Sequence, residues 1–323
     1  MLESITYIRA SLYLGAGLAI GFGAIGAALG EGYAAGKANE ALSFRPEKSG
    51  DVIKNMLVGQ AIAESAAIFA LVVSILLLFM KPGSTNMLVA WASIGAGLAM
   101  GLSAIGSGVG AGLPAGTACF GIVRQPASSN KILTTMLVGS AVCQTPAIFG
   151  MVIAFLLLFL DLSSIPLYPG WAAVFGAGLS TGLSAIGPGI GNGITAMEAV
   201  RGVARNHETI SATNRTMLVG LGVAQSTAIY GFLISLMLLF YGFKENHSLT
   251  SSMALLGAGV CMGFGGIGPG IGEGITASLA VKWIARNPPL TGVLSRTMLV
   301  GMAVAESTGI YSLIVALLLI VMI

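Results

Sequence analysis

The sequence predicts an all-α membrane protein of eight transmembrane helices, which form four tandem α-helical hairpins. Of its 323 residues, 55% are hydrophobic and only 8% are charged, whereas soluble domains carry about 25% charged residues. An open sheet in lipid would leave backbone groups unpaired, so these apolar segments favour helices over strands. The 47 glycines allow such helices to pack closely.

Four copies of one segment make up the chain. Their second halves contain "NMLVGQAIAESAAIF", "TMLVGSAVCQTPAIF", "TMLVGLGVAQSTAIY" and "TMLVGMAVAESTGIY". One position of this phrase, spaced by 80, 81 and 81 residues, holds Glu64, Gln144, Gln225 and Glu306. A position in the first halves keeps the same spacing and holds Glu31, Ala111, Asn192 and Glu273. Two separate positions with one period indicate a fourfold internal duplication.

Each copy contains two apolar segments. The uncharged runs at residues 10–30, 132–160, 162–197 and 216–243 exceed the roughly 20 residues that span a bilayer as a helix. The predicted hairpins occupy residues 1–83, 84–165, 166–247 and 248–323. Twelve of the 15 Lys and Arg residues lie in the loops inside the hairpins, and the connections between hairpins hold only Lys81 and Lys244. The positive-inside rule then places these loops in the cytoplasm and both termini outside.

Several functional classes are disfavoured. The phrases "GPGIGEG" and "GSGVGAG" look like phosphate-binding loops, but such loops need a preceding strand and a βαβ unit. These glycines suit tight packing of inner helices instead, and Pro188 and Pro269 should bend those helices. No basic cluster typical of nucleic-acid binding is present. Metal-ligand spacing is absent from Cys119, Cys143 and Cys261.

The repeated carboxylate indicates ion transport. A charged carboxylate at the bilayer centre costs about 2.5–3.5 kcal/mol or more, so a proton or a cation must neutralise it. We expect Glu64 and Glu306 to carry the ion, with Glu31 and Glu273 as partners on the neighbouring helix. One member of each pair should be protonated at neutral pH, because adjacent carboxylates do not readily both ionise in a low dielectric. The alternative is a Glu held neutral by internal hydrogen bonds.

Oxygen ligands suit a hard cation such as Na⁺. Around an ion at Glu306, Ser307, the carbonyl of Val304 and a water held by Thr308 can complete the shell. The alternative for both hydroxyls is a hydrogen bond to a carbonyl of the preceding turn.

The copies differ in their ligands. Ala66 and Phe69 replace a Thr and a Tyr beside Glu64, so the sequence does not settle Na⁺ against H⁺ for the chain as a whole. At Glu306 we expect Na⁺ selectivity, because the oxygen ligands there are complete. Gln144 and Gln225 do not exchange a charge, so hairpins two and three should carry no ion.

The pattern resembles the proteolipid, or c subunit, of rotary ATPases, over nearly the whole chain. That protein is a hairpin with a glycine-rich first helix, a polar loop with Arg-Gln-Pro or Arg-Asn-Pro, and a mid-membrane carboxylate on the second helix. "RQP" at 124–126 and "RNP" at 286–288 fit the loop, whereas "FRP" at 44–46 and "RNH" at 205–207 depart from it. "AESTGIY" and the paired carboxylates are similar to the sodium-type, double-carboxylate F-type variant. The fused hairpins are similar to vacuolar-type proteolipids.

The resemblance implies an ion-carrying component of a closed rotor ring, in a bacterial plasma (inner) membrane. Each carboxylate would release its ion near an Arg of a stator a subunit and reload from the other side, coupled to ATP hydrolysis or synthesis. The chain would have no catalytic site and no cofactor, and Na⁺ or H⁺ would be the transported ion. Its partners would be its own copies, the stator, central-stalk subunits and membrane lipid, without nucleic acid. The stalk-contacting residues would be Arg45, Arg124, Gln125, Arg205, Arg286 and Asn287, with loops one and three left open.

Two carriers in four hairpins lower the number of ions moved per turn. Each turn against a given membrane potential then needs less work. Such a ring suits an ATP-driven pump better than a synthase.

The surviving polar residues predict which hairpins meet at each site. By the resemblance, the site lies between neighbouring hairpins and Tyr311 would hold a carboxylate. Hairpins three and four keep "STAIY" and "STGIY", whereas hairpins one and two read "SAAIF" and "TPAIF". One rule fits all four copies, in which each hairpin donates its ligands to the carboxylates of the next; random drift is the alternative. The ligands of Glu273 and Glu306 would be Val223, Ser226, Thr227 and Tyr230, and those of Glu31 and Glu64 in the following chain would be Val304, Ser307, Thr308 and Tyr311.

Two other functional readings compete with the rotor. A non-rotary secondary transporter built from parallel repeats also has midplane sites on broken helices. A purely structural membrane oligomer is disfavoured by the paired carboxylates. Size in mild detergent distinguishes these readings, because the rotor predicts a closed ring of several copies; the number of chains does not follow from the sequence.

Overall fold

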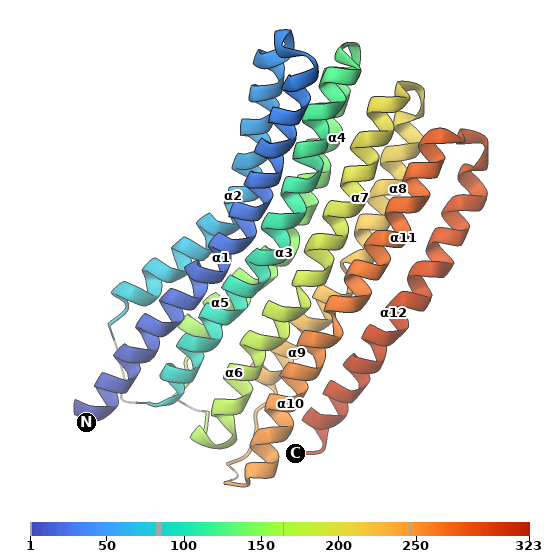
Figure 1. Cartoon of the computed structure of the whole chain (residues 1–323). Coiled ribbons are helices and arrows are strands. Elements are labelled where there is room, and N and C mark those ends of the chain that lie inside the picture. Colours follow the sequence, from blue (N-terminus) through green and yellow to red (C-terminus); the bar gives the residue numbers. More distant parts are fainter. Residues whose placement is uncertain (1, 82–85, 164, 246) are drawn as a thin grey trace.

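The computed structural model describes residues 2–81, 86–163, 165–245 and 247–323, and every regular element in these ranges is a helix. Eight helical segments of the described chain are long and apolar enough to cross a membrane, which confirms the predicted fold class. The segments pair into four hairpins that follow one another in a row (Figure 1).

The bounds of the helices follow the four repeats. Hairpin one contains α1 (Leu2–Phe44) and α2 (Ser49–Phe79). Hairpin two contains α3 (Leu88–Arg124), α4 (Ser129–Cys143) and α5 (Thr145–Phe159). Hairpin three contains α6 (Leu167–Ser184), α7 (Ile186–Arg205), α8 (Ile210–Ala224) and α9 (Ser226–Phe240). Hairpin four contains α10 (Leu249–Gly265), α11 (Ile267–Arg286) and α12 (Thr291–Val321).

The predicted hairpin boundaries fall between these helices. The boundary at 83/84 lies outside the described residues. The boundary at 165/166 lies between α5 and α6, and the boundary at 247/248 lies between α9 and α10.

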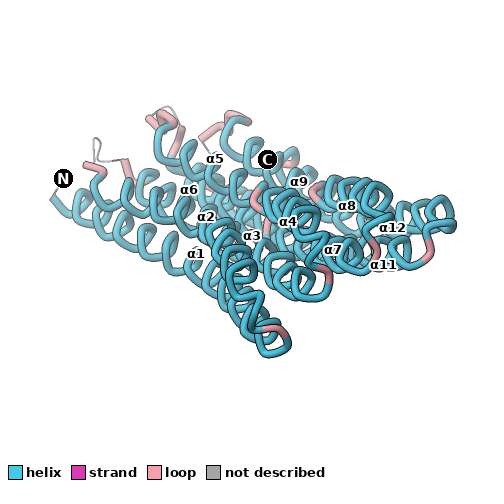
Figure 2. The backbone as a smooth tube through the Cα atoms, turned by 90° about the horizontal axis from the view of Figure 1, so that it is seen from above, coloured by secondary structure: helices cyan, strands magenta, loops and turns pink. Residues whose placement is uncertain are grey.

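The hairpins form two rows of helices, which Figure 2 shows from above. The inner row consists of α1, α3, α6–α7 and α10–α11, and neighbouring members pack along their lengths. The outer row consists of α2, α4–α5, α8–α9 and α12. An outer helix lies between the inner helix of its own hairpin and that of the next hairpin: α2 contacts α1 and α3, and α8 contacts α7 and α11. In the described part of the chain, α12 packs on α10 and α11 of its own hairpin, and its far side is left open.

Glycine explains how closely the inner helices approach. A Cβ atom added to Gly112 would collide with the backbone of Gly30, and one added to Gly193 would collide with Gly110. Gly274 stands in the same relation to Gly191. Each of these contacts lies beside the polar position of the first half of the repeat, so the inner helices touch at the depth of the site.

Four helices are interrupted near their centres. The breaks at Ala185 and Gly266 each come three residues before Pro188 and Pro269, as predicted from the lost hydrogen bond and the ring clash of proline. A break at Gln144 comes two residues before Pro146. Nothing in the local sequence explains the break at Gln225.

The four loops inside the hairpins share one conformation. Each contains a short 3₁₀ turn, at Pro46–Lys48, Pro126–Ser128, His207–Thr209 and Pro288–Leu290. The third loop has no proline at its start. There the side chain of Asn206 accepts a hydrogen bond from the backbone N–H of Glu208 at 3.1 Å and caps the turn. All four loops lie at the same end of the molecule (Figure 1).

Candidate ion-binding sites

The two outer-row glutamates occupy the middle of their helices. Glu64 lies 15 residues from each end of α2, since 64 − 49 and 79 − 64 are both 15. Glu306 lies 15 residues from each end of α12, since 306 − 291 and 321 − 306 are both 15. Each carboxylate is therefore about 22 Å from either helix end, and lies deep inside any bilayer of about 30 Å core thickness that these helices span.

A tyrosine from one hairpin contacts the glutamate of the next. The hydroxyl of Tyr230 on α9 donates a hydrogen bond to Glu306 Oε1 on α12, with an O–O distance of 2.6 Å. Glu273 on α11 is fully buried, and its carboxylate is close enough to Glu306 to interact with it electrostatically. Ser226 and Thr227 begin α9 one turn before Tyr230. We call these five residues the intrachain site.

The intrachain site holds several buried oxygens without hydrogen-bond partners. Both carboxylate oxygens of Glu273 are in this state, as are Ser226 Oγ and Thr227 Oγ1. Buried polar atoms are normally satisfied, so these oxygens are suited to ligate a hard cation or to share protons. Among the described residues, no group of three or more His, Cys, Asp or Glu side chains is placed to hold a metal. The carboxylate and hydroxyl oxygens of the intrachain site are ligands of the type that suit a hard cation.

The hydrogen bond from Tyr230 to Glu306 joins hairpin three to hairpin four, and donation from each hairpin to the next stays a prediction. Val223, the remaining predicted ligand, lies two residues before the break at Gln225 that starts α9. The hydroxyls beside Glu306 on its own helix donate to main-chain carbonyls of that helix. Ser307 donates to the carbonyl of Val304 at 2.7 Å, and Thr308 donates to that of Ala305 at 3.1 Å. These are the preceding-turn hydrogen bonds that the sequence left as the alternative.

The residues predicted for the second site lie at opposite edges of the row. Glu31 and Glu64 belong to hairpin one, and their carboxylates interact electrostatically. Tyr311 on α12 is 62% exposed. Figure 1 shows α1 and α2 at one edge and α12 at the other. Within one chain these residues do not meet. The sequence predicts that these residues meet between two adjacent chains, and we call Glu31, Glu64, Ser307, Thr308 and Tyr311 the edge site.

The two glutamines close the corresponding positions in hairpins two and three. Gln144 Nε2 donates to the carbonyl of Ile62 at 2.9 Å. Gln225 Nε2 donates to the carbonyl of Val142 at 3.1 Å. Ile62, Val142 and Val223 occupy the same position of the repeat. In both glutamine sites, an amide N–H therefore donates to a carbonyl at the repeat position of Val223 and Val304. The sequence predicts that the carbonyls of Val223 and Val304 bind the ion.

Two residues near the sites were missed by the sequence reasoning. Gln60 Nε2 donates to the backbone carbonyl of Glu31 at 3.2 Å, and Thr195 Oγ1 donates to the carbonyl of Gly274 at 3.0 Å. Gln60 comes four residues before Glu64, so its helical position places it on the same face. That spacing was the available signal. Nothing in the sequence pointed to Thr195.

The predicted stalk-contacting residues lie at the shared loop end. Each of the last three inner helices ends on one of the arginines, and the residues after two of them continue the motif. Arg45 lies between α1 and the first 3₁₀ turn. The others lie at or just after the ends of α3, α7 and α11, and are Arg124, Gln125, Arg205, Arg286 and Asn287.

Known proteins with this pattern are components of ATP synthases. The family model for the C subunit of ATP synthase matches residues 14–77, 94–157, 175–238 and 256–319. The chain is 36% identical over 231 residues to the K subunit of the A-type ATP synthase of Methanocaldococcus jannaschii, across 72% of this chain and 96% of that protein. It is 58% identical over 65 residues to the ATP synthase c subunit of Petrotoga mobilis, across 20% of this chain and 68% of that protein.

A similar match covers almost all of a single-hairpin relative. The chain is 50% identical over 79 residues to the ATP synthase c subunit of Thermotoga maritima, across 23% of this chain and 93% of that protein. Together with the eight membrane-spanning helices, these matches show that the chain is a multi-pass integral membrane protein of the ATP synthase C-subunit family, with four fused copies of the family unit.

Proposed function

We propose that the chain forms the ion-carrying rotor ring of a rotary ATPase, with two working ion sites for every four hairpins. Members of the family form rings within ATP synthase complexes, so the chain associates with its own copies. The hydrogen bond from Tyr230 to Glu306 is the observation that carries the finer proposal. It joins a hydroxyl and a carboxylate from two hairpins, which is the arrangement expected of a site between neighbours in a ring.

The mechanism follows from the charge on Glu306. When a Na⁺ or a proton is bound, the carboxylate is neutral overall and the outer row can face lipid. When the ion leaves, the charged carboxylate is costly in lipid and is stabilised only by a cationic group, which we assign to a stator Arg. Tyr230 holds Glu306 against α9 in the loaded state. Glu273 and the free oxygens of Ser226 and Thr227 supply further ligands.

The glutamine sites would stay closed during this cycle. Their amides already donate to the carbonyls of Ile62 and Val142, and an amide neither takes up nor releases a charge. Two neutral interfaces per chain follow, which lower the number of ions moved in each turn. We therefore favour an ATP-driven pump over a synthase.

The orientation and the partners at the loop end belong to the same proposal. The basic loops would face the cytoplasm by the positive-inside rule. Central-stalk subunits would contact the shared 3₁₀ turns. Loops one and three depart from the family motif in sequence but adopt the same turn, which supports contact by all four.

The test is ion transport by the purified, reconstituted complex carrying Glu64→Gln and Glu306→Gln together. We expect the double variant to lose ATP-driven Na⁺ or H⁺ uptake. Labelling of the wild-type glutamates by a carbodiimide, at several pH values with and without Na⁺, identifies the ion, because bound Na⁺ protects a carboxylate. Transport that persists in the double variant would reject the proposal. Particles of one or two chains in mild detergent would favour the secondary transporter instead.

A further inference from the structure

A basic pocket opens between the first three hairpins, on the inner row. Its volume is about 410 Å³, and it is lined by Tyr33, Lys37, Glu40, Thr117, Phe120, Gly121, Arg124, Arg201, Ala204 and Arg205. These residues come from α1, α3 and α7. The pocket takes no part in the ion sites, which lie between outer and inner helices closer to the middle of the membrane. We call it the inner-row pocket.

The inner-row pocket carries an excess of positive charge. Four of its lining residues are cationic and one is acidic. Lys37 Nζ pairs with Glu40 at 2.6 Å, and Arg201 pairs with Glu198 just outside the lining. In the described part of the chain, Arg124 and Arg205 form no ion pair. Two unpaired guanidinium groups beside one cavity favour an anion, and Arg is suited to bind a phosphate through two parallel hydrogen bonds.

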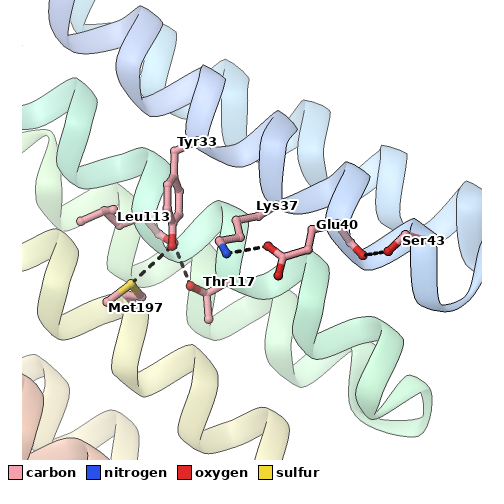
Figure 3. Close-up of polar contacts among 7 residues, drawn as sticks. All are labelled: Tyr33, Lys37, Glu40, Ser43, Leu113, Thr117 and Met197. Atoms are coloured by element: carbon pink, nitrogen blue, oxygen red, sulfur yellow. Dashed lines mark hydrogen bonds and ion pairs between the residues drawn. The ribbon is translucent and has the colours of Figure 1, made fainter.

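The wall of the pocket offers hydroxyl groups as well. Figure 3 shows Tyr33 extending from α1 toward α7, where its hydroxyl contacts Met197 Sδ at 3.8 Å. A thioether is a weak acceptor, so this hydroxyl remains able to donate to a stronger one. Thr117 lies nearby, and its own hydrogen is donated to the carbonyl of Leu113 at 3.1 Å.

The pocket lies at the depth of lipid headgroups. Lys37 is six residues beyond Glu31 on α1 and Arg205 is 13 residues beyond Asn192 on α7, which correspond to about 9 Å and about 20 Å along the helices. Glu31 and Asn192 mark the level of the sites. Half of the hydrocarbon core is about 15 Å, so the pocket spans the boundary between acyl chains and headgroups.

The next hairpin does not repeat this pocket in the described part of the chain. The matching groove one hairpin later is lined by Glu198, Arg201, Gly202, Arg205, Lys282, Ala285 and Arg286, and has a volume of about 10 Å³. Glu198 stands there at the repeat position of Thr117, and Leu113 stands at that of Tyr33. The acid and the smaller space leave no room for a phosphate. Of the two grooves that lie within one chain, the first alone is therefore suited to a phosphate.

We propose that the inner-row pocket binds the phosphate group of one anionic phospholipid per chain. Arg124 and Arg205 are the principal ligands, with Lys37 and Tyr33 on the opposite wall. Basic pockets between transmembrane helices on the cytoplasmic side are suited to acidic headgroups. The acyl chains would run along the inner row toward the middle of the membrane. This proposal does not depend on which ion the chain carries.

The experiment counts lipids on the purified full-chain assembly by native mass spectrometry, after delipidation and addition of phosphatidylglycerol or phosphatidylcholine. We expect one retained phosphatidylglycerol per chain and no comparable retention of phosphatidylcholine. In an Arg124→Gln, Arg205→Gln variant the affinity should fall roughly 30-fold, because each Lys or Arg near an anionic lipid contributes on the order of fivefold. An Arg215→Gln, Arg296→Gln variant, which removes two cations from outer helices, should bind like the wild type.

A charge-preserving variant and two competitors complete the test. Arg124→Lys with Arg205→Lys should keep most of the affinity. This variant shows whether lipid loss in the glutamine variant comes from the lost charge or from defective assembly. Retention of equal amounts of both lipids, or unchanged retention in the glutamine variant, would overturn the proposal. Displacement of the lipid by inorganic phosphate would show a small-anion site instead. Loss of central-stalk binding with unchanged lipid retention would show a protein-docking surface.

Discussion

Tyr230 and Tyr311 occupy the same position of the repeat, but only Tyr230 finds its glutamate within the chain. We expect Tyr230→Phe to weaken ion binding at Glu306 on the order of 10- to 100-fold, because a hydrogen bond to a charged group contributes about 1.5–3 kcal/mol. Carbodiimide labelling of Glu306, followed as a function of Na⁺ and pH, measures the effect.

Tyr311→Phe is the matched control for this change. It should leave the labelling of Glu306 unchanged and alter that of Glu64. Equal effects of both variants on both glutamates would contradict the assignment of one tyrosine to each site.

Gln225 and Asn192 belong to the same neutral interface but differ in their hydrogen bonds. Gln225→Ala would remove the donor to the part-buried carbonyl of Val142, and a carbonyl left unsatisfied there costs up to the roughly 1–3 kcal/mol of a fully buried group. We expect a lower thermal midpoint of the assembly with ion transport retained. Asn192→Ala should cost little, because neither amide atom of Asn192 has a partner. Loss of transport in Gln225→Ala would show that this interface does carry ions.

The residues of the intrachain site could largely be predicted from the sequence. The repeat register aligned Glu306 with Glu64, and the uneven survival of the "STxIY" phrase singled out Tyr230 as a candidate partner of Glu306. The structure has a hydrogen bond between these two side chains, and their role in ion binding stays a prediction. Gln60 and Thr195 could not be found in that way, since they contact backbone carbonyls. Every residue has a backbone carbonyl, so the sequence does not show which carbonyl a side chain contacts. That contact depends on how the helices pack.

Glycine sets the spacing of the inner row at the scale of whole helices. Gly193→Ala should disrupt folding or assembly, because the added methyl group would overlap the backbone of α3 at Gly110, and overpacking costs about 1–3 kcal/mol even where neighbours can shift. Gly222→Ala in α8 is the control, as no atom lies within 4 Å of its added Cβ. It should be neutral or should stabilise the helix by about 0.5–1 kcal/mol.

The yield and thermal midpoint of the purified assembly measure both glycine variants. Normal assembly of Gly193→Ala would mean that the inner helices are farther apart than the structure places them.

The helical hairpins could be predicted from the sequence, as could two of the four breaks within the long helices. The apolar composition and the repeat period of 80–81 residues predicted the number of helices. Pro188 and Pro269 predicted the positions of two bends. The break at Gln144 could have been predicted from Pro146, whose missing N–H frees the carbonyl of Val142. Gln225 takes up that carbonyl from the next hairpin. The break at Gln225 itself has no such local signal.

Neighbouring chains should meet at the open side of α12. A Cβ atom on Gly309 would lie 3.1 Å from Thr227 Cγ2, so cysteines at these positions can form a disulfide between hairpins three and four. Ala67 and Thr308 are the equivalent pair between hairpin one and hairpin four. With the native cysteines replaced, we expect Ala67→Cys with Thr308→Cys to link different chains.

Denaturing gels read out this prediction. The Ala67→Cys, Thr308→Cys protein should give a ladder of oligomers after oxidation. The Thr227→Cys, Gly309→Cys protein should stay at the size of one chain, with its disulfide internal. A monomer band alone from the first pair would contradict the edge site.

At the scale of the molecule, the sequence predicted the order of the hairpins but not the inner-row pocket. Lys37, Arg124 and Arg205 were all counted as loop charges that set orientation. Their convergence depends on α1, α3 and α7 lying side by side, and on a small Thr117 where the next groove has Glu198. The pocket depends on residues from three different repeats that lie side by side in the folded chain. An alignment of the four copies does not show which residues become neighbours in this way.

In the proposed rotor, Glu64 and Glu306 lie in the hairpins at the two edges of the row, so the working sites would be unevenly spaced around the ring. Around a ring, the interface inside each chain at Glu306 is followed at once by the interface with the next chain at Glu64, and then by two silent ones. The stator would meet charges in pairs, one hairpin apart, with three hairpins to travel before the next pair. Two torque-generating steps would follow one another closely, and an interval without ion transfer would come before the next pair. An elastic stalk would have to carry the rotation across that pause, storing twist from each pair of strokes and returning it while no charge faces the stator.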